Sequence, residues 1–381
     1  MNRIPLAEPV MRGNEWKYVK ECLDSGWVSS VGSYVDRFEE VVKKFVGAEH
    51  AVAVTNGTAA LHLALLVAGV HEGDAVLVPA LTFIAPVNAV RYVGAEPIFF
   101  DCDPNTLCLD TDSVLRFLAE ECEERADHSP YHKRTGRRVA AVIPVHVFGN
   151  PIAMDPLVAV CARSRICVIE DATESLGSTY RGRATGTIGD IGCFSFNGNK
   201  IITTGGGGMI VTNHEDFARR SRHLSTQAKK DTFWYDHDEI GYNYRLTNIQ
   251  AALGVAQMEV LPAFVSRKRE IAARYRDLME GVPEVRVLEE GEGAKSNYWL
   301  STIQVPEVHQ ESLLQYVNER GIQARPVWKP IHTLLMYRAC ETYAMEHAPQ
   351  LSRSCLNLPS SVSIADEDIV FVAETVKHYF K

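Results

Sequence analysis

Short runs of apolar residues alternate with helical patterns from about residue 50 onward. Residues 59–68 are almost all apolar and predict a buried helix after a turn at 55–58. Strand-length runs, many of them rich in Val and Ile, stand at 51–54, 75–78, 97–100, 139–145, 166–169, 193–196 and 209–211. Continuous apolar strands separated by helices are typical of a mostly parallel sheet with helices on both faces. We therefore expect an α/β fold.

The pattern changes after residue 254. Residues 255–280 predict one long amphipathic helix, in which Pro262 indicates a kink or a break. A strand at 298–305, a helix near 310–320 and a final helix from Asp366 predict a smaller α+β domain. We divide the chain into a large domain, residues 1–255, and a small C-terminal domain, residues 256–381. The charged stretch 119–138 predicts an exposed excursion.

Composition narrows the class of protein. Of 381 residues, 46% are apolar and 23% charged, which provides for a sizeable core. The net charge of −9, without a Lys/Arg-rich tract, argues against nucleic acid as a partner but leaves room for a small anion in a local pocket. The nine cysteines form no Cys-x-x-Cys pair and predict reduced core thiols. We find no signal-peptide core and no apolar run of ~20 residues, so we expect a cytoplasmic protein without a membrane segment. No residue is assigned to a metal.

The first candidate for chemistry is Lys200. It stands between the strand predicted at 192–196 and four consecutive glycines at 205–208. Glycines let a backbone approach a ligand closely or turn sharply. A lysine there could bind phosphate, form a Schiff base, or be a plain surface lysine beside a flexible turn. The segment is not a Walker A loop, because Ile201 follows the lysine.

Two further elements fit a cofactor site. Asp171 ends a predicted strand, where open α/β sheets bind ligands, although it could also cap a helix. Gly57 and Thr58 begin the buried helix, whose free N–H groups form an anion site, and Ser195 could add a hydroxyl. Each signal is weak alone. An acid, a lysine and a phosphate cradle in one domain indicate a cofactor site more strongly than any of the three does alone.

Together these motifs resemble the DegT/DnrJ/EryC1/StrS family of sugar aminotransferases, which have the aspartate aminotransferase-like (fold type I) architecture. The resemblance runs over nearly the whole chain, and its most specific parts are the Lys200 segment and Gly-Tyr-Asn-Tyr-Arg at 241–245. It implies pyridoxal 5'-phosphate (PLP) as cofactor, with pyridoxamine phosphate as the alternate form. It also implies L-glutamate and a nucleotide sugar as substrates, and a homodimer whose active sites are shared across the interface.

The resemblance implies a role for each matching residue. Lys200 would carry PLP as a Schiff base and shuttle the proton. Asp171 would pair with the pyridine nitrogen, and Phe83 would stack on the ring. The phosphate would be held by Gly57, Thr58 and Ser195, and by Asn243 of the second subunit. Glu174 would lie near the 3-hydroxyl of the cofactor. The substrate-side candidates are His332, contributed across the dimer interface, Trp27 and Tyr337, and for each of them a packing role stays open.

The substrate is the least determined part. Gly206 stands where many relatives carry Glu, and residues 197–204 resemble the branch that makes 4-amino sugars of the bacillosamine or legionaminate type. We therefore expect amination of UDP-2-acetamido-4-keto-2,6-dideoxyhexose for a surface glycan. A 3-aminotransferase, or an enzyme for GDP- or dTDP-sugars, is the alternative within the family.

Other classes stay open beside it. A PLP-dependent sugar dehydratase is disfavoured, because such enzymes replace the lysine with histidine. A nucleotide-binding module at residues 57–58 is disfavoured by the lack of a Gly-x-Gly-x-x-Gly fingerprint. A non-catalytic PLP-binding regulator on the same fold would retain the lysine.

Overall fold

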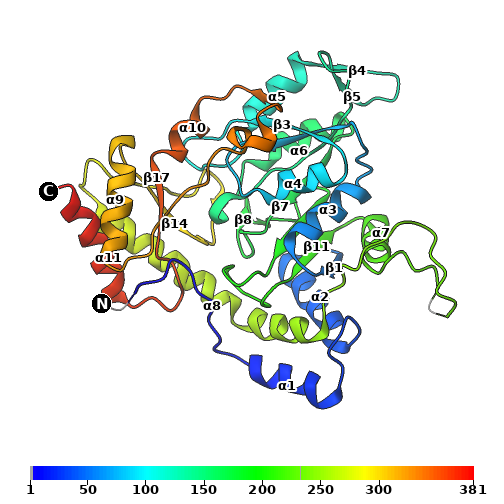
Figure 1. Cartoon of the computed structure of the whole chain (residues 1–381), viewed down its shortest axis with the longest axis horizontal. Helices are drawn as coiled ribbons and strands as arrows, with labels where there is room; N and C mark the ends of the chain where they lie inside the picture. The colour runs from blue at the N-terminus through cyan, green and yellow to red at the C-terminus, as the bar shows by residue number, and fades with distance from the viewer. Residues whose placement is uncertain (1–2, 232) are drawn as a thin grey trace.

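An eight-stranded sheet forms the centre of the larger part of the molecule (Figure 1). The computed structural model describes residues 3–231 and 233–381. In spatial order the strands are β1 (His50–Val54), β11 (Gly208–Thr212), β10 (Ile191–Ser195), β7 (Cys167–Asp171), β6 (Val139–Val142), β2 (Ala75–Pro79), β3 (Glu96–Phe100) and β16 (Glu341–Tyr343). β11 runs antiparallel to both its neighbours, and all other neighbouring pairs are parallel. The predicted α/β class with a mixed, mostly parallel sheet is confirmed.

Seven helices of the described residues precede or connect these strands: α1 (Glu15–Ser25), α2 (Ser33–Val46), α3 (Gly57–Val67), α4 (Ala85–Tyr92), α5 (Thr111–Glu120), α6 (Met154–Arg163) and α7 (Glu215–Ser225). α3 begins two residues earlier than predicted. The reason is the cap at Asn56, whose side-chain oxygen accepts from the N–H of Ala59 at 2.8 Å. The short elements are β4 (Cys122–Glu124), β5 (Pro130–His132), β8 (Thr179–Tyr180), β9 (Arg183–Ala184), β13 (Ala294–Lys295) and the 3₁₀ turn η1 (Val147–Gly149).

The long helix α8 (Asn248–Met279) joins the two parts of the molecule (Figure 1). It begins seven residues before the predicted start, since Thr247 caps it by accepting from the N–H of Gln250. The expected break at Pro262 is absent, and the helix runs through the proline. By length and composition alone α8 could cross a membrane, but half of its most apolar stretch is buried. It packs against α1 and α2, so burial in the core accounts for its apolar character.

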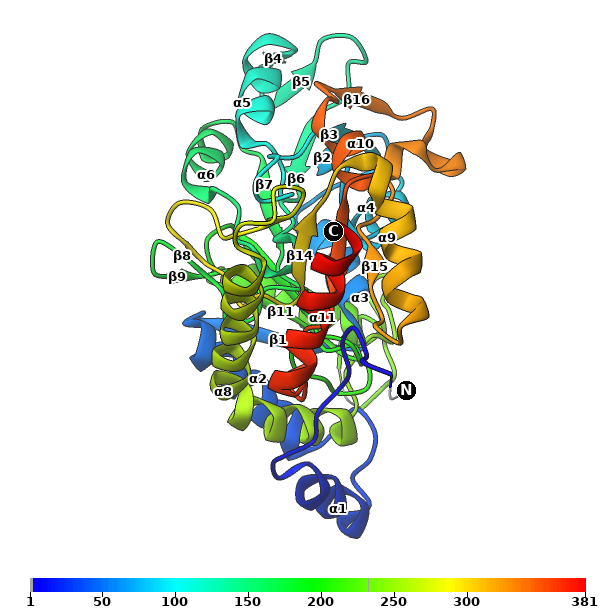
Figure 2. The same ribbon diagram turned by 90° about the vertical axis from the view of Figure 1, so that its left-hand side faces the viewer.

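A second, four-stranded sheet has the order β12 (Arg286–Val287), β14 (Ser301–Gln304), β17 (Cys355–Leu358) and β15 (Arg325–Pro326). The helices α9 (Glu307–Glu319) and α11 (Asp366–Tyr379) lie with this sheet (Figure 2). They enclose a separate apolar core that includes Ile303, Leu356 and Ile369. The strand predicted from residue 298 starts only at 301, because Tyr298 takes a left-handed backbone conformation with φ +47°.

Two segments cross between these parts. Ile4 forms a bridge with Ile322 and is buried in the second core. In the other direction, β16 extends the large sheet and α10 (His347–Ser352) follows it. Asp101, just after β3, accepts from the first N–H groups of this helix region at 2.6–2.7 Å. Residues 341–348 therefore lie with the large sheet although they follow residue 255, and the two-domain division stays a prediction.

The charged excursion at 119–138 is only partly exposed. It forms the β4–β5 hairpin, and His132 is buried with its Nε2 3.4 Å from the carboxylate of Glu341 on β16. The hairpin therefore packs beside the last strand of the sheet. All nine cysteines are free thiols, and seven are buried, as expected for core packing.

Candidate active site

The candidate residues meet at one edge of the large sheet. β1 and β10 are both antiparallel to β11, so they run in the same direction as β7. The carboxyl ends of these three strands therefore lie together, as in other ligand sites of open α/β sheets. Asp171 ends β7, Ser195 ends β10, and β1 leads into Gly57 at the start of α3.

Lys200 follows β10, and its amine is covered by two side chains. Its Nζ lies 3.3 Å from Oε1 of Glu174 and 4.2 Å from the ring centre of Trp299. The indole Nε1 of Trp299 donates to the carbonyl of Asn199 at 2.7 Å, which holds the ring beside the lysine. A carboxylate and an aromatic face both attract an ammonium group. Sequence reasoning missed Trp299, because no spacing rule connects it with residue 200.

Asp171 and Glu174 are buried next to Lys200. Burial raises the pKa of Asp171, and this is opposed by hydrogen bonds from Thr173 and by the charge of Lys200. Burial also raises the pKa of Glu174, opposed by Lys200 and by the N–H of Phe148, which donates to Oε2 at 2.8 Å. Buried carboxylates are costly to ionise without a cationic partner. Glu174 has such a partner in Lys200, and Asp171 would be stabilised by a bound cation.

The neighbouring acid, Glu170, is fully buried and has a structural role. Its carboxylate accepts from Nε2 of His146 and from the N–H groups of Gly186, Ile188 and Gly189, at 2.6–2.9 Å. Nδ1 of His146 in turn accepts from the N–H of Ile152, so Nε2 carries the proton. Glu170 thus secures the loop before β10, whereas Asp171 faces the charge of Lys200.

A series of aromatic rings joins Phe83 to the lysine. The ring of Phe83, half of which is exposed, lies 6.4 Å from Trp328. Trp328 packs on Phe148 at 4.5 Å, and Phe148 lies 6.2 Å from Trp299. Phe148 adopts a left-handed conformation with φ +53°, which is uncommon for a bulky residue. Its packing on Trp328 and its hydrogen bond to Glu174 hold it there. The rings form an apolar wall beside the amine.

The start of α3 fits a phosphate group. A β-carbon on Gly57 would stand 2.9 Å from Cβ and 3.2 Å from Oγ of Ser195, so the two residues are already in close contact. The first N–H groups of a helix have no partner within the helix. The structure therefore brings together Gly57, the half-buried Thr58 and the Ser195 hydroxyl, which matches the predicted cradle.

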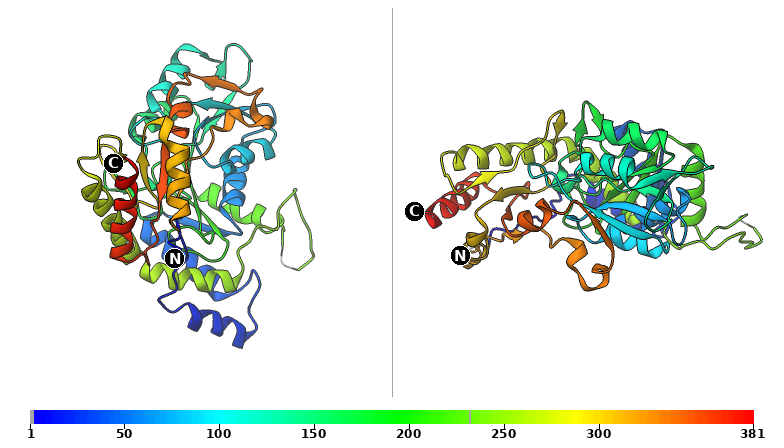
Figure 3. Two further views of the ribbon diagram at one scale, coloured as in Figure 1. Left: turned by 60° about the vertical axis from the view of Figure 1, so that its left-hand side comes forward. Right: turned by 90° about the horizontal axis from the view of Figure 1, so that it is seen from above.

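Among the described residues, the side chain of Asn243 makes no hydrogen bond to Gly57, Thr58 or Ser195 of its own chain. It is exposed and borders a groove of about 550 Å³ that is also lined by Arg222, Lys229, Lys230 and Arg245. The segment between α7 and Asn243 projects from the molecule (Figures 1 and 3). We call residues 227–241 the arm. Its Phe233, Trp234, Tyr235 and Ile240 are 78–85% exposed. Apolar side chains this exposed mark an interaction surface.

The substrate-side candidates are spread over several places. Tyr337 is buried, and its hydroxyl donates to Asn88 at 2.6 Å, which fits the packing alternative. His332 lies near Phe99, and among the described residues no group bonds to its buried Nδ1. Trp27 is exposed and borders a cavity of about 630 Å³ that is also lined by Tyr34. Their roles stay predictions.

One cluster offers metal-binding groups at the base of the arm. Ligand atoms of His223, Asp238 and Glu239 lie within 4.8 Å of one another. Arg220 donates to both carboxylate oxygens of Glu239 at 2.8 and 3.2 Å, and His223 pairs with Asp238 at 2.7 Å. These side chains therefore form an ion-pair network that ties the arm to α7.

Comparisons with known proteins agree with this geometry. The model of the DegT/DnrJ/EryC1/StrS aminotransferase family matches residues 9–377. A GDP-perosamine synthase of Escherichia coli O157:H7 is 39% identical over 382 residues, covering 100% of this chain and 99% of the relative. A GDP-perosamine synthase of Vibrio cholerae is 37% identical over 381 residues, covering 99% of each.

A similar solved structure is that of Spr1654 of Streptococcus pneumoniae in its PLP form. It is 26% identical and superposes with a TM-score of 0.89, covering 99% of this chain and 98% of the other. The similar curated relatives act on GDP-linked sugars by name, whereas the motif resemblance favours a UDP-linked one. The comparisons thus favour the GDP-sugar alternative over the UDP expectation.

Proposed function

Because this chain belongs to the DegT/DnrJ/EryC1/StrS aminotransferase family and is a PLP-dependent sugar aminotransferase, we propose that it aminates a GDP-linked 4-keto-6-deoxyhexose. L-Glutamate is the proposed amino donor. The product would be a GDP-linked 4-amino sugar for a surface polysaccharide.

The observation that carries the chemistry is the placement of Lys200. Its amine contacts Glu174 and Trp299, lies near Asp171, and follows the strand that ends at Ser195. The GDP assignment is supported by two GDP-perosamine synthases that match this chain from end to end. Perosamine is a 4-amino-4,6-dideoxyhexose, which sets the proposed position of amination.

The residues present fit PLP. Lys200 would bond to the cofactor aldehyde, Asp171 would pair with the ring nitrogen, and Phe83 would cover the ring. The phosphate would lie on the cradle of Gly57, Thr58 and Ser195. When bound, PLP withdraws electrons from the carbon that loses its proton.

Each protein group then has a definite task. The amine of Lys200 would take the proton from the amino donor and would deliver it to the cofactor when PLP is bound. Glu174 orients this amine through its hydrogen bond, and its own carboxylate is fixed by Phe148. The ring of Trp299 covers the amine and limits access of water. The carboxylate of Asp171 keeps the ring nitrogen protonated, and that charge offsets the cost of its burial.

The site is proposed to be completed in a homodimer. The side chain of Asn243 is exposed and makes no hydrogen bond to the cradle residues among the described residues, and large apolar side chains of the arm are exposed as well. In a twofold dimer the same surfaces serve both subunits, so each Asn243 would reach the phosphate of the other subunit. The arm is the proposed contact.

The decisive experiment is a glutamate-dependent assay with a panel of nucleotide keto sugars. We expect turnover with GDP-4-keto-6-deoxymannose and at least about tenfold lower kcat/KM with the UDP-linked 2-acetamido sugar, a difference of ~1.4 kcal/mol in the transition state. NMR of the product gives the aminated carbon and its configuration. A preference for the UDP sugar would overturn the GDP assignment.

The Lys200→Ala variant tests the core of the mechanism. It should lose multiple turnover and the Schiff-base absorbance, and the melting temperature of its apo form should fall at neutral pH because the buried Glu174 loses its cationic partner. Normal turnover by this variant would refute the role of Lys200. Absence of turnover by the wild type on every sugar, with PLP bound, would instead favour a non-catalytic regulator.

A further inference from the structure

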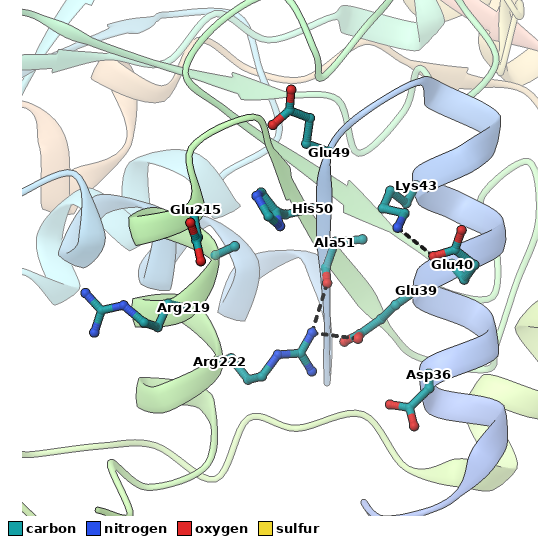
Figure 4. Close-up of a pocket in the computed structure, with 11 residues that line it drawn as sticks. Asp36, Glu39, Glu40, Lys43, Glu49, His50, Ala51, Glu215, Arg219 and Arg222 are labelled. Atoms are coloured by element: carbon teal, nitrogen blue, oxygen red, sulfur yellow. Dashed lines mark hydrogen bonds and ion pairs between the residues drawn. The ribbon is translucent and has the colours of Figure 1, made fainter.

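A buried carboxylate on α2 connects two elements of the proposed cofactor site. Glu39 is 7% exposed. Its Oε1 accepts from the N–H of Ala53 at 2.7 Å and from Nη1 of Arg245 at 2.5 Å. Its Oε2 accepts from Nη2 of Arg222 at 2.7 Å (Figure 4). Hydrogen bonds between ionised partners are about twice as strong as neutral ones, so the Glu39 carboxylate binds both arginines strongly.

The same arginines bind the outer edge of β1. This strand is the last of the sheet, so one row of its backbone groups has no neighbouring strand. Arg222 donates to the carbonyl of Ala51 at 3.2 Å, and Arg245 to that of Ala53 at 3.1 Å (the first is drawn in Figure 4). One residue beyond β1, the N–H of Thr55 donates to the carbonyl of Tyr244 at 2.8 Å. The segment 243–245 is thereby fixed against β1.

In the proposed dimer, β1 and the segment 243–245 each lead to residues that would bind a cofactor phosphate. β1 leads through residue 56 into Gly57, which belongs to the cradle of the same subunit. The segment 243–245 carries Asn243, which would reach the cradle of the partner. We propose that Glu39 is a positioning residue that sets PLP affinity at both sites, at its own through β1 and at the partner's through Arg245. This inference rests on the proposed function and on the proposal that Asn243 reaches the phosphate cradle of the partner subunit.

The first test is Glu39→Gln, which keeps the shape of the side chain but places an amide N–H₂ against a guanidinium. We expect PLP to bind the apo enzyme at least about tenfold more weakly, the consequence of losing one charge-assisted hydrogen bond. The titration follows the Schiff-base absorbance. At saturating PLP, kcat should recover to near the wild-type value. The matched control is Glu40→Gln on the same helix, since Glu40 is exposed and pairs only with Lys43.

The titration separates positioning from a merely structural role. A structural role would lower the melting temperature of the apo form and leave the PLP dissociation constant unchanged, and that result would overturn the proposal. Should Glu39→Gln fail to fold, Arg245→Lys replaces it. The lysine keeps the charge, but its amine ends one bond short of the position of Nη1 of Arg245, the atom that donates both to Glu39 and to the carbonyl of Ala53. Unchanged PLP affinity in that variant would equally overturn the proposal.

Mixed dimers test action at both sites. One subunit carries Lys200→Ala, so only the other subunit can form a Schiff base. Glu39→Gln is then placed either on the subunit that keeps Lys200 or on its partner. We expect weaker PLP binding in both arrangements, by about threefold or more each. An effect confined to one arrangement would refute the coupling of the two sites. Failure of the proposed function would look different, because wild-type enzyme would then form no Schiff base or show no turnover.

Discussion

Replacing Gly57 by alanine tests the phosphate cradle most directly. The new β-carbon would stand 2.9 Å from Cβ of Ser195 and 3.1 Å from Cγ2 of Thr173. Carbon atoms in ordinary contact lie about 3.5–4.0 Å apart, and Cβ of Ser195 cannot move without the strand that carries it. Overpacking of this kind costs roughly 1–3 kcal/mol. Alanine in a helix regains about 0.5–1 kcal/mol over glycine, so the net loss of stability is at most about 2.5 kcal/mol.

The effect on the cofactor should exceed the effect on the fold. At this chain length, 1 kcal/mol corresponds to only about 1–2 °C in melting temperature, so the apo variant should melt at most about 5 °C lower. The displaced start of α3 should weaken at least one hydrogen bond to a charged phosphate, worth about 1.5–3 kcal/mol. We therefore expect PLP to bind roughly ten- to hundredfold more weakly, measured by absorbance titration of the apo enzyme.

Two further variants decide whether contact with Ser195 is the cause. Gly198→Ala is the matched control, because a β-carbon there meets no atom within 4 Å. This variant should leave the melting temperature of the apo form and the PLP affinity unchanged. Adding Ser195→Gly to Gly57→Ala removes the 2.9 Å contact and leaves the 3.1 Å approach to Thr173, so it should restore part of the melting temperature but not the affinity, because the hydroxyl is lost. Wild-type PLP affinity in Gly57→Ala would refute the cradle, and an unrestored melting temperature would refute the steric explanation.

Substitutions at three other residues test the proposed site and the buried lysine beside it. Asp171→Asn should lower kcat at least about hundredfold, as expected for loss of an electrostatic contact made in the transition state. The apo form of this variant should be no less stable than the wild type at neutral pH. The reason is that burial raises the pKa of Asp171, so its ionised form costs stability there. Trp299→Leu should retain PLP but slow turnover about tenfold, since a cation–π contact is worth ~1–2 kcal/mol, and Trp299→Phe should recover most of it. Burial lowers the pKa of Lys268 to about 7. Above pH 7 the unfolded chain therefore binds more protons than the folded chain. The free energy of unfolding should then rise from about pH 7 towards pH 10 by up to ~1.4 kcal/mol per pH unit. Lys268→Met should flatten the melting temperature over that range, and an unchanged slope would show that this lysine is not the cause.

The residues that sequence reasoning located share a local signature. Asp171 and Ser195 end apolar runs that could only be strands, and Gly57 opens an apolar run that could only be a helix. Strand ends and helix starts meet at one edge in a parallel sheet, so their proximity follows from the pattern. Lys200 adjoins one of those ends. Local pattern therefore predicted that these residues lie close together, and their role in binding the cofactor stays a prediction.

The residues that it missed are joined only by tertiary packing. Trp299 follows α8 in the chain, yet its ring lies over the amine of Lys200. Glu39 lies far before Arg245 in the chain, yet the two side chains form a hydrogen bond. β16 was assigned with the small domain because it follows α8 in the chain, yet hydrogen bonding to β3 places it in the large sheet. Periodicity reports which face of an element is buried, but it does not report what that face is buried against.

The same distinction explains why the motif resemblance favours a UDP-linked sugar, whereas the relatives that match over the whole chain act by name on GDP-linked sugars. The UDP expectation rested mainly on residues 197–204, which in the structure adjoin Lys200 and the end of β10. Residues in that position serve the amine and the cofactor, which every nucleotide sugar shares. The base of a nucleotide sugar is bound farther from the amine, so the residues that select it are expected outside this segment, with Trp27 and the arm as candidates. Identity over the whole chain includes such residues, and the relatives at 37–39% identity are GDP-perosamine synthases by name. Exchanging the arm residues 231–236 with those of a UDP-specific relative should therefore change nucleotide preference more than exchanging residues 197–204.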